Sequence, residues 1–157
     1  MPCQETIELP SLAETQTLGR RLGQTAIPGD VITLSGDLGA GKTTLTQAIG
    51  QGIEVPDSCY ITSPTFALIH EYPARIPLYH IDLYRLADQE ETETLGLEDY
   101  IYGEGLTVIE WPDRLGDLMP ENYLGIELIF TGENARTVIL TAHHKTWEAR
   151  IKAILRG

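Results

Sequence analysis

Residues 36–43 read GDLGAGKT, the complete pattern G-x-x-x-x-G-K-[ST] of a phosphate-binding loop. A short apolar run at 31–34, typical of a buried strand, precedes the loop, and a helical pattern at 43–50 follows it. This strand–loop–helix context distinguishes a phosphate-binding loop from a chance match. The segment therefore predicts a P-loop fold, against the simpler interpretation of a glycine-rich turn before a surface helix. Lys42 is also the only lysine before Lys145.

The residue types of the loop fit the chemistry of phosphate binding. Its glycines permit backbone angles closed to other residues, so that successive N–H groups can point at phosphate oxygens. The first turn of the following helix adds N–H donors and the positive end of its dipole. Lys42 is expected to reach the β- and γ-phosphates, and the Thr43 hydroxyl to bind Mg²⁺. The indicated ligand is a nucleoside triphosphate with magnesium, bound by Asp37, Leu38, Gly39, Ala40, Gly41, Lys42, Thr43 and Thr44.

The length of 157 residues favours one domain, residues 1–157, with a single core. No apolar run approaches the roughly 20 residues that cross a bilayer, and the first residues lack a basic stretch followed by an apolar one. These features predict a cytoplasmic protein with no membrane attachment. Two cysteines are too few for a disulfide framework and show no metal-ligand spacing.

The charge of the chain is strongly acidic, with a formal net value of −12. Between residues 71 and 121 there are thirteen Asp or Glu and three Arg. Such a surface repels phosphate backbones, which argues against direct, nonspecific nucleic-acid binding by the body of the domain. From residue 136 onward five basic residues oppose one Glu. This basic end is either a solvated helix face or a contact for RNA or an acidic partner protein.

Hydrophobic periodicity predicts an α/β fold with a mostly parallel central sheet, antiparallel C-terminal strands and flanking helices. Ser11 with Glu14 three residues later forms a capping box at the start of the first helix. Residues 106–110 read LTVIE, a mostly apolar run typical of a strand buried on both faces. The expected strands are 6–9, 31–34, 65–72, 78–83, 106–110, 124–130 and 136–142, and the expected helices are 12–26, 43–50, 88–95 and 145–155.

Two carboxylates end predicted buried strands, Asp82 after residues 78–81 and Glu110 after residues 106–109. Ligands of open α/β sheets bind beyond the carboxyl ends of parallel strands, which brings both acids near the loop. One would orient a water bound to magnesium, and the other would bind the metal or position the attacking water. Which acid contacts the metal stays open, and for each the plain alternative is the start of a surface loop.

Residues 62–66, TSPTF, lie between the loop helix and the next strand. Other P-loop proteins place a segment that senses the γ-phosphate at this point of the chain. The hydroxyls of Ser63 and Thr65 are candidates for such contacts. An ordinary turn is the alternative.

Five motifs occur in one order along nearly the whole chain, from about residue 11 to 140. They are GDLGAGKTT at 36–44, TSPT at 62–65, HIDLYRL at 80–86, GLEDY at 96–100 and IEWP at 109–112. This series resembles the TsaE (YjeE) family, the small ATPases of bacterial tRNA threonylcarbamoyladenosine (t6A) biosynthesis. The residues around TSPT differ from the usual family pattern, since Ile61 and Thr62 precede Ser63 and Phe66 replaces a tyrosine.

The resemblance implies roles for particular residues. Thr43 and Glu110 would contact Mg²⁺, with Lys42, Asp82 and Glu110 as the catalytic set. Asp82, Ser63 and Thr65 would lie on the γ-phosphate side. Trp111 would neighbour the nucleotide, and Arg136 matches a position near it.

The resemblance also implies a function: an ATP- and Mg²⁺-dependent subunit that works with a threonylcarbamoyl transferase and that enzyme's inactive paralogue. It would meet tRNA only indirectly or through its basic end, and it would be a monomer when alone. Turnover in isolation is expected to be slow, because no arginine occupies an obvious finger position and Arg85 is the nearest by motif.

Two other functions stay open. A small-molecule kinase of the P-loop class usually carries a lid with several arginines, whereas Arg75, Arg85 and Arg114 are scattered. A nucleotide-gated binding module without meaningful hydrolysis is the third class.

Overall fold

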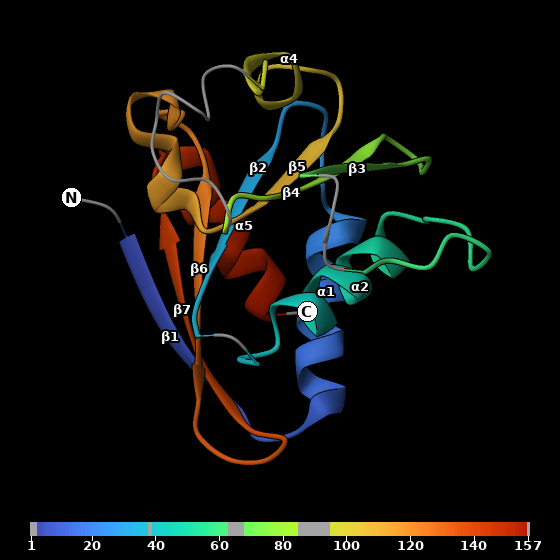
Figure 1. Cartoon of the computed structure of the whole chain (residues 1–157). Coiled ribbons are helices and arrows are strands. Elements are labelled where there is room, and N and C mark those ends of the chain that lie inside the picture. Colours follow the sequence, from blue (N-terminus) through green and yellow to red (C-terminus); the bar gives the residue numbers. More distant parts are fainter. Residues whose placement is uncertain (1–2, 38, 63–67, 85–94, 157) are drawn as a thin grey trace.

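The computed structural model describes residues 3–37, 39–62, 68–84 and 95–156, and Figure 1 shows the course of the chain. Within these residues one sheet contains seven strands in the order β1-β7-β6-β2-β5-β4-β3. The strands are β1 Cys3–Leu9, β2 Val31–Ser35, β3 Ile69–Tyr72, β4 Leu78–Asp82, β5 Leu106–Glu110, β6 Leu124–Phe130 and β7 Arg136–Ala142. The helices are α1 Leu12–Gln24, α2 Lys42–Gly52, α4 Glu98–Ile101, α5 Lys145–Arg156 and the 3₁₀ helix η1 Pro112–Leu118.

The four central strands of the sheet, β6, β2, β5 and β4, run parallel. Antiparallel strands complete both edges, with β7 and β1 beyond β6 and with β3 beyond β4. The expected α/β fold, with a parallel centre and antiparallel C-terminal strands, is confirmed.

Most elements lie where the hydrophobic pattern predicts them. The C-terminal hairpin matches its expected bounds, and the Ser11 side chain accepts the N–H of Glu14 at the start of α1. Strand β3 begins only at Ile69, and the earlier part of the expected strand at 65–72 reaches residues 65–67, outside the described part of the chain. Residues 88–94 of the expected helix at 88–95 also fall outside it. Helix η1 was not predicted.

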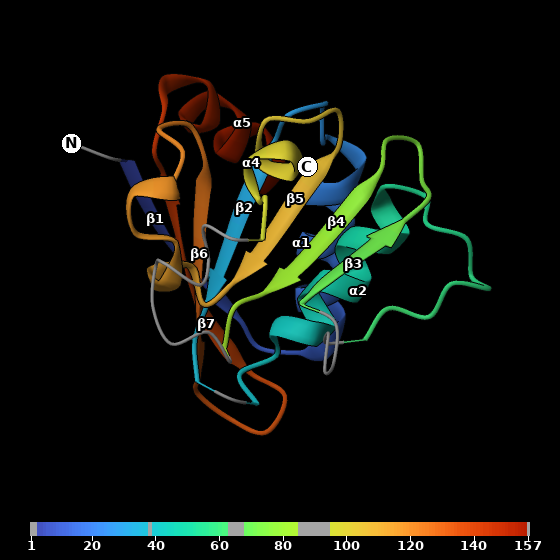
Figure 2. The ribbon, with the colours of Figure 1, turned by 45° about the horizontal axis from the view of Figure 1, so that its top comes forward.

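Helices lie on both faces of the sheet, as Figures 1 and 2 show from two directions. The sheet separates two hydrophobic clusters. On one face, α1, α2 and α5 pack over residues such as Ile32, Leu34 and Val108. On the other, α4 and η1 pack over Val31 and Ile109. Alternation along β2 and β5 thus buries both sides of these strands. No helix in the described part of the chain is long and apolar enough to span a membrane.

Helices α1 and α2 approach so closely that glycine is required at their contact. A Cβ added to Gly19 would collide with the Cβ of Ala48, and one added to Gly23 would collide with the carbonyl oxygen of Ile49. From the other helix, a Cβ on Gly52 would meet the backbone of Arg20. Interiors pack at crystal-like density, so this contact fixes the distance between the helices and hence the position of α2.

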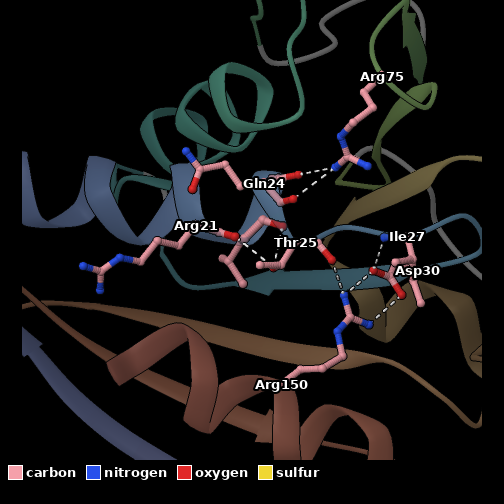
Figure 3. Close-up of polar contacts among 9 residues, drawn as sticks. Arg21, Gln24, Thr25, Ile27, Asp30, Arg75 and Arg150 are labelled. Atoms are coloured by element: carbon pink, nitrogen blue, oxygen red, sulfur yellow. Dashed lines mark hydrogen bonds and ion pairs between the residues drawn. The ribbon is translucent and has the colours of Figure 1, made fainter. Parts of the chain in front are cut away.

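The carboxyl end of α1 is held by two arginines from distant parts of the chain (Figure 3). Arg75, from the turn between β3 and β4, donates to the carbonyl of Gly23 at 2.9 Å. Arg150 of α5 donates to the carbonyl of Thr25 at 3.1 Å and forms a two-pronged ion pair with buried Asp30 at 2.6 and 2.8 Å. Cationic donors suit the negative end of a helix dipole.

This ion pair changes the interpretation of the basic C-terminal end. Arg150 serves the fold through Asp30 and α1, and its guanidinium lies 3.8 Å from the ring centre of Trp147. Lys145, Lys152 and Arg156 remain exposed on α5. The surface charge available to a partner at this end is therefore smaller than the sequence indicates.

We predict that Gly23→Ala lowers the free energy of unfolding by about 2 kcal/mol, because the backbones of α1 and α2 must separate to admit the methyl group. This loss exceeds the gain in helix propensity that alanine brings. Gln24→Ala, at the exposed next position of the same helix, is the matched control and should change stability little. Urea unfolding followed by circular dichroism measures the stability of both variants. If the two variants were equally stable, the contact between α1 and α2 would not require glycine at position 23.

Candidate functional site

The phosphate-binding motif forms a turn between β2 and α2. Gly36, Gly39 and Gly41 have φ angles of 143°, 82° and 105°, all in the region that favours glycine. A Cβ at Gly36 would also collide with the backbone carbonyl of Leu128 on β6. Gly41 is the N-cap of α2, so the loop leads directly into the positive end of this helix, where backbone N–H groups point toward the loop. The predicted strand–loop–helix arrangement is confirmed, with Leu38 outside the described residues.

The side chain of Lys42 is folded against its own loop. Its Nζ donates to the carbonyl of Gly36 at 2.7 Å and lies 4.3 Å from the ring centre of Trp111. Only 6% of the residue is exposed. A carbonyl and an aromatic face both attract an ammonium group, so these two contacts hold the Lys42 side chain at the mouth of the loop.

Asp82 and Glu110 lie side by side at the carboxyl ends of β4 and β5. They are paired positions in the register of the two parallel strands. Both lie on the α2 side of the sheet, because each follows by an even number of residues a side chain buried there, Leu78 and Val108 respectively. The register thus brings the two predicted carboxylates together next to the loop.

A cavity of about 390 Å³ joins these groups. Of the residues proposed from the sequence, Asp37 and Ala40 do not line it, while Leu38, Ser63 and Thr65 lie outside the described part of the chain. Tyr84 lines the cavity as well and was not singled out. The lining residues are Gly39, Gly41, Lys42, Thr43, Thr44, Asp82, Tyr84, Glu110, Trp111 and Arg136.

The carboxyl group of Asp82 is half-buried, and this burial raises its pKa above the ordinary value of 3.8. The backbone N–H of Tyr84, which donates to Oδ1 at 2.9 Å, acts against that rise. The charge of Glu110 adds to the increase of the pKa, while His80 and Lys42 oppose it. The cavity therefore contains an acid whose ionised form is less stable than that of an exposed aspartate.

His80 contacts Glu110 directly and was missed as a site residue in the sequence. Its Nε2 lies 2.5 Å from Oε2 of Glu110, and the two side chains are 0% and 3% exposed. His80 precedes Asp82 by two residues, so strand alternation alone places it on the same face. The contact of His80 with Glu110, however, can be inferred only once β4 is known to pair with β5.

Trp111 adopts a left-handed backbone conformation, with φ 60° and ψ 54°, directly before Pro112 begins η1. This sharp turn at the end of β5 directs the indole toward Lys42 and Tyr84, whose ring centre is 4.9 Å away. A non-glycine residue in this region is uncommon and strained, which makes a functional reason for the conformation worth testing.

Arg136 connects the C-terminal hairpin to the phosphate-binding loop. Its Nε donates to the carbonyl of Ala40 at 2.6 Å, and its guanidinium lies 4.8 Å from the ring centre of Phe130. Two further bonds join its Nη1 to the carbonyls of Gly132 and Ala135. The side chain lines the cavity, and its observed bonds hold the shape of the loop.

The donor set fits magnesium only if a ligand contributes oxygens. Among the described residues no three His, Cys, Asp or Glu side chains gather into a metal-binding group. Thr43 and Glu110 both line the cavity, and hydroxyl and carboxylate oxygens are ligands that Mg²⁺ accepts. Magnesium is commonly held by one or two protein oxygens together with phosphates and water, which this pair matches.

Known proteins resemble this chain in both structure and sequence. The crystal structure of YdiB from Bacillus subtilis matches with a TM-score of 0.81 and 32% identity, covering 99% of this chain and 97% of that one. The tRNA threonylcarbamoyladenosine biosynthesis protein TsaE of Nostoc sp. (strain PCC 7120) is 44% identical, covering 89% of this chain and 87% of that protein. The protein of the same name from Bacillus subtilis (strain 168) is 38% identical, with 91% and 89% covered.

The match with a protein family covers the loop, both carboxylates and Arg136. The family described as threonylcarbamoyl adenosine biosynthesis protein TsaE matches residues 9–138. This span runs from the last residue of β1 into β7. The chain therefore belongs to the TsaE family.

Proposed function

We propose that this chain binds ATP with Mg²⁺ and hydrolyses it as a subunit of the protein assembly that forms t6A in tRNA. The observation that carries the proposal is the single cavity shared by Lys42, Thr43, Asp82 and Glu110. It combines a cation and helix N–H groups for phosphate with two carboxylates at parallel strand ends. The role in t6A formation rests on family membership and on the names of the relatives.

The residues of the cavity would have different roles in the transfer of the γ-phosphoryl group to water. Lys42 and the N–H groups at the start of α2 would bind the β- and γ-phosphates and stabilise the charge that develops on them. Thr43 and Glu110 would hold Mg²⁺, which supplies charge neutralisation to the phosphate oxygens when bound. Asp82 would lie on the γ-phosphate side and orient the attacking water.

Binding of phosphate requires Lys42 to exchange partners. In this structure its ammonium group bonds the Gly36 carbonyl and faces Trp111. Phosphate oxygens are stronger acceptors for a cation than a carbonyl, so this exchange favours the bound state. The indole of Trp111 would then sense the arrival of nucleotide through the movement of the cation next to it.

The partners we propose are a threonylcarbamoyl transferase and its inactive paralogue. The chain is strongly acidic, and its C-terminal helix exposes few basic side chains. Both features suit a protein that reaches tRNA through other proteins. Hydrolysis would then change the shape of the assembly. Within the cavity the described cations are Lys42 and Arg136, and Arg136 already bonds the loop. A partner is therefore the expected source of further transition-state stabilisation.

We predict that Lys42→Ala weakens ATP binding about 10- to 100-fold, because charge-assisted hydrogen bonds to phosphate are lost. Isothermal titration calorimetry with Mg-ATP measures the affinity. Lys152→Ala, at an exposed position of α5, removes the same charge far from the loop and should bind like the unaltered chain. If the two variants bound ATP equally well, Lys42 would not be part of the binding site.

A labelled-ATP experiment tests the alternative function. If labelled ATP yielded a phosphorylated metabolite, a kinase would replace the ATPase proposal.

We predict slow ATP turnover by the chain alone and faster turnover when the transferase and its paralogue are added. Phosphate release under single-turnover conditions, with and without the two proteins, measures the difference. A partner that completes a P-loop site with a cation accelerates hydrolysis about 10³-fold or more. An equally fast reaction without partners would contradict partner activation.

We predict that Asp82→Asn abolishes hydrolysis but makes the nucleotide-free protein more stable at pH 7. A carboxyl with a raised pKa binds its proton more tightly in the folded state, so its ionisation destabilises the fold as pH rises above about 3.8. Asparagine keeps an oxygen for the N–H of Tyr84 and carries no charge. The gain in melting temperature should shrink as the pH falls toward 3.8. A variant less stable at pH 7 would contradict this account.

A further inference from the structure

His80 is a fully buried imidazole that lies behind the cavity. It does not line the cavity, whereas Glu110, the residue it contacts, does. A carboxylate that binds a metal ion can only accept hydrogen bonds, so for that role of Glu110 Nε2–H of His80 is the donor and Oε2 the acceptor.

The other ring nitrogen suggests that His80 does not serve stability alone. Its Nδ1 is buried and has no hydrogen-bond partner among the described residues. The neighbouring positions of the same face, Leu78 on β4 and Val108 on β5, are apolar and fully buried. A buried polar atom without a partner destabilises a fold, and an apolar side chain would avoid that cost at this position.

The contact with Glu110 indicates a role for His80, which is to restrict the rotation of the carboxylate. A glutamate has three side-chain torsions, and a carboxylate free to rotate would lose conformational entropy on binding an ion. The bond from His80 ties one oxygen of Glu110 to the neighbouring strand, and Glu110 lines the cavity, where its second oxygen would serve a ligand. Residues that hold a metal ligand in place raise metal affinity without touching the metal.

We propose that His80 is a positioning residue, which orients the Glu110 carboxylate for the magnesium ion that accompanies ATP. The inference rests on the proposed function, since it assigns a role within the same site. His80 touches neither the nucleotide nor the ion and acts only through its bond to Glu110. Its contribution therefore belongs to the magnesium-dependent part of ATP binding and not to the contacts of the loop with phosphate.

The test compares ATP affinity in Mg²⁺ with ATP affinity in EDTA by isothermal titration calorimetry. The ratio of the two affinities isolates the part that depends on magnesium. His80→Leu removes the donor, His80→Gln keeps an amide N–H at about the reach of Nε2, and His80→Asn keeps a shorter amide that does not reach Glu110. Thr107→Val is the control for disturbance of the core, because Thr107 is fully buried on the opposite face of β5 and bonds the carbonyl of Tyr100.

We expect His80→Leu and His80→Asn to lower the ratio about tenfold or more, while affinity in EDTA stays unchanged. His80→Gln should restore the ratio, and Thr107→Val should keep it even if its melting temperature falls. If the leucine variant does not fold, the glutamine and asparagine variants still differ only in reach. A merely structural role would lower both affinities together, or neither.

Two results would overturn the positioning role and leave the ATPase proposal standing. One is a normal ratio in His80→Asn, and the other is a ratio in His80→Gln as low as in His80→Leu. If the unaltered chain did not bind ATP at all, the proposed function itself would be wrong. If that chain bound ATP equally well in Mg²⁺ and EDTA, the metal role of Glu110 and the positioning role of His80 would both be refuted.

Discussion

The close packing of α1 against α2 determines where the phosphate-binding loop lies, because α2 begins at Lys42, within the last residues of the loop motif. The contact tolerates no Cβ at Gly19 or Gly23, so the two helices have one separation at which they fit. Arg75 and Arg150 then fix the far end of α1 to the β3–β4 turn and to α5. Helix packing thus positions the end of the loop at α2, and the bond from Arg136 to Ala40 holds the loop before it.

Strand register supplies the second half of the site. In β4 and β5 side chains alternate between the two faces, and the parallel pairing aligns Asp82 with Glu110. A shift of one residue in either strand would turn its carboxylate toward α4 and η1 and bury it among apolar side chains. The apolar residues of the two strands therefore specify the position of the acids, since only one register buries them correctly.

This division explains which parts of the molecule were predictable from the sequence. The loop, the carboxylates at strand ends and the C-terminal hairpin each follow from a local pattern, and the structure has them where they were expected. The bond between His80 and Glu110 depends on which strands are neighbours, and the bond from Arg136 to Ala40 joins residues far apart in the chain. The spacing of residues along the sequence does not predict such contacts. The roles expected of Ser63 and Thr65 stay predictions, because these residues lie outside the described part of the chain.

The groups at the site carry energetic costs that the rest of the fold offsets. Burial raises the pKa of Asp82, Nδ1 of His80 is buried without a partner among the described residues, and Trp111 holds a strained backbone conformation. All three lie on β4 or at the end of β5, within reach of one cavity, whereas the helix contact and the ion pair of Asp30 with Arg150 lie elsewhere. Unfavourable local features that gather in one place indicate a site selected for binding, since packing alone would favour apolar residues there. In the proposed function, the positive charge of magnesium would relieve part of this cost, because a nearby cation stabilises the ionised form of Asp82. Nucleotide binding should therefore stabilise the fold most strongly at the ends of β4 and β5.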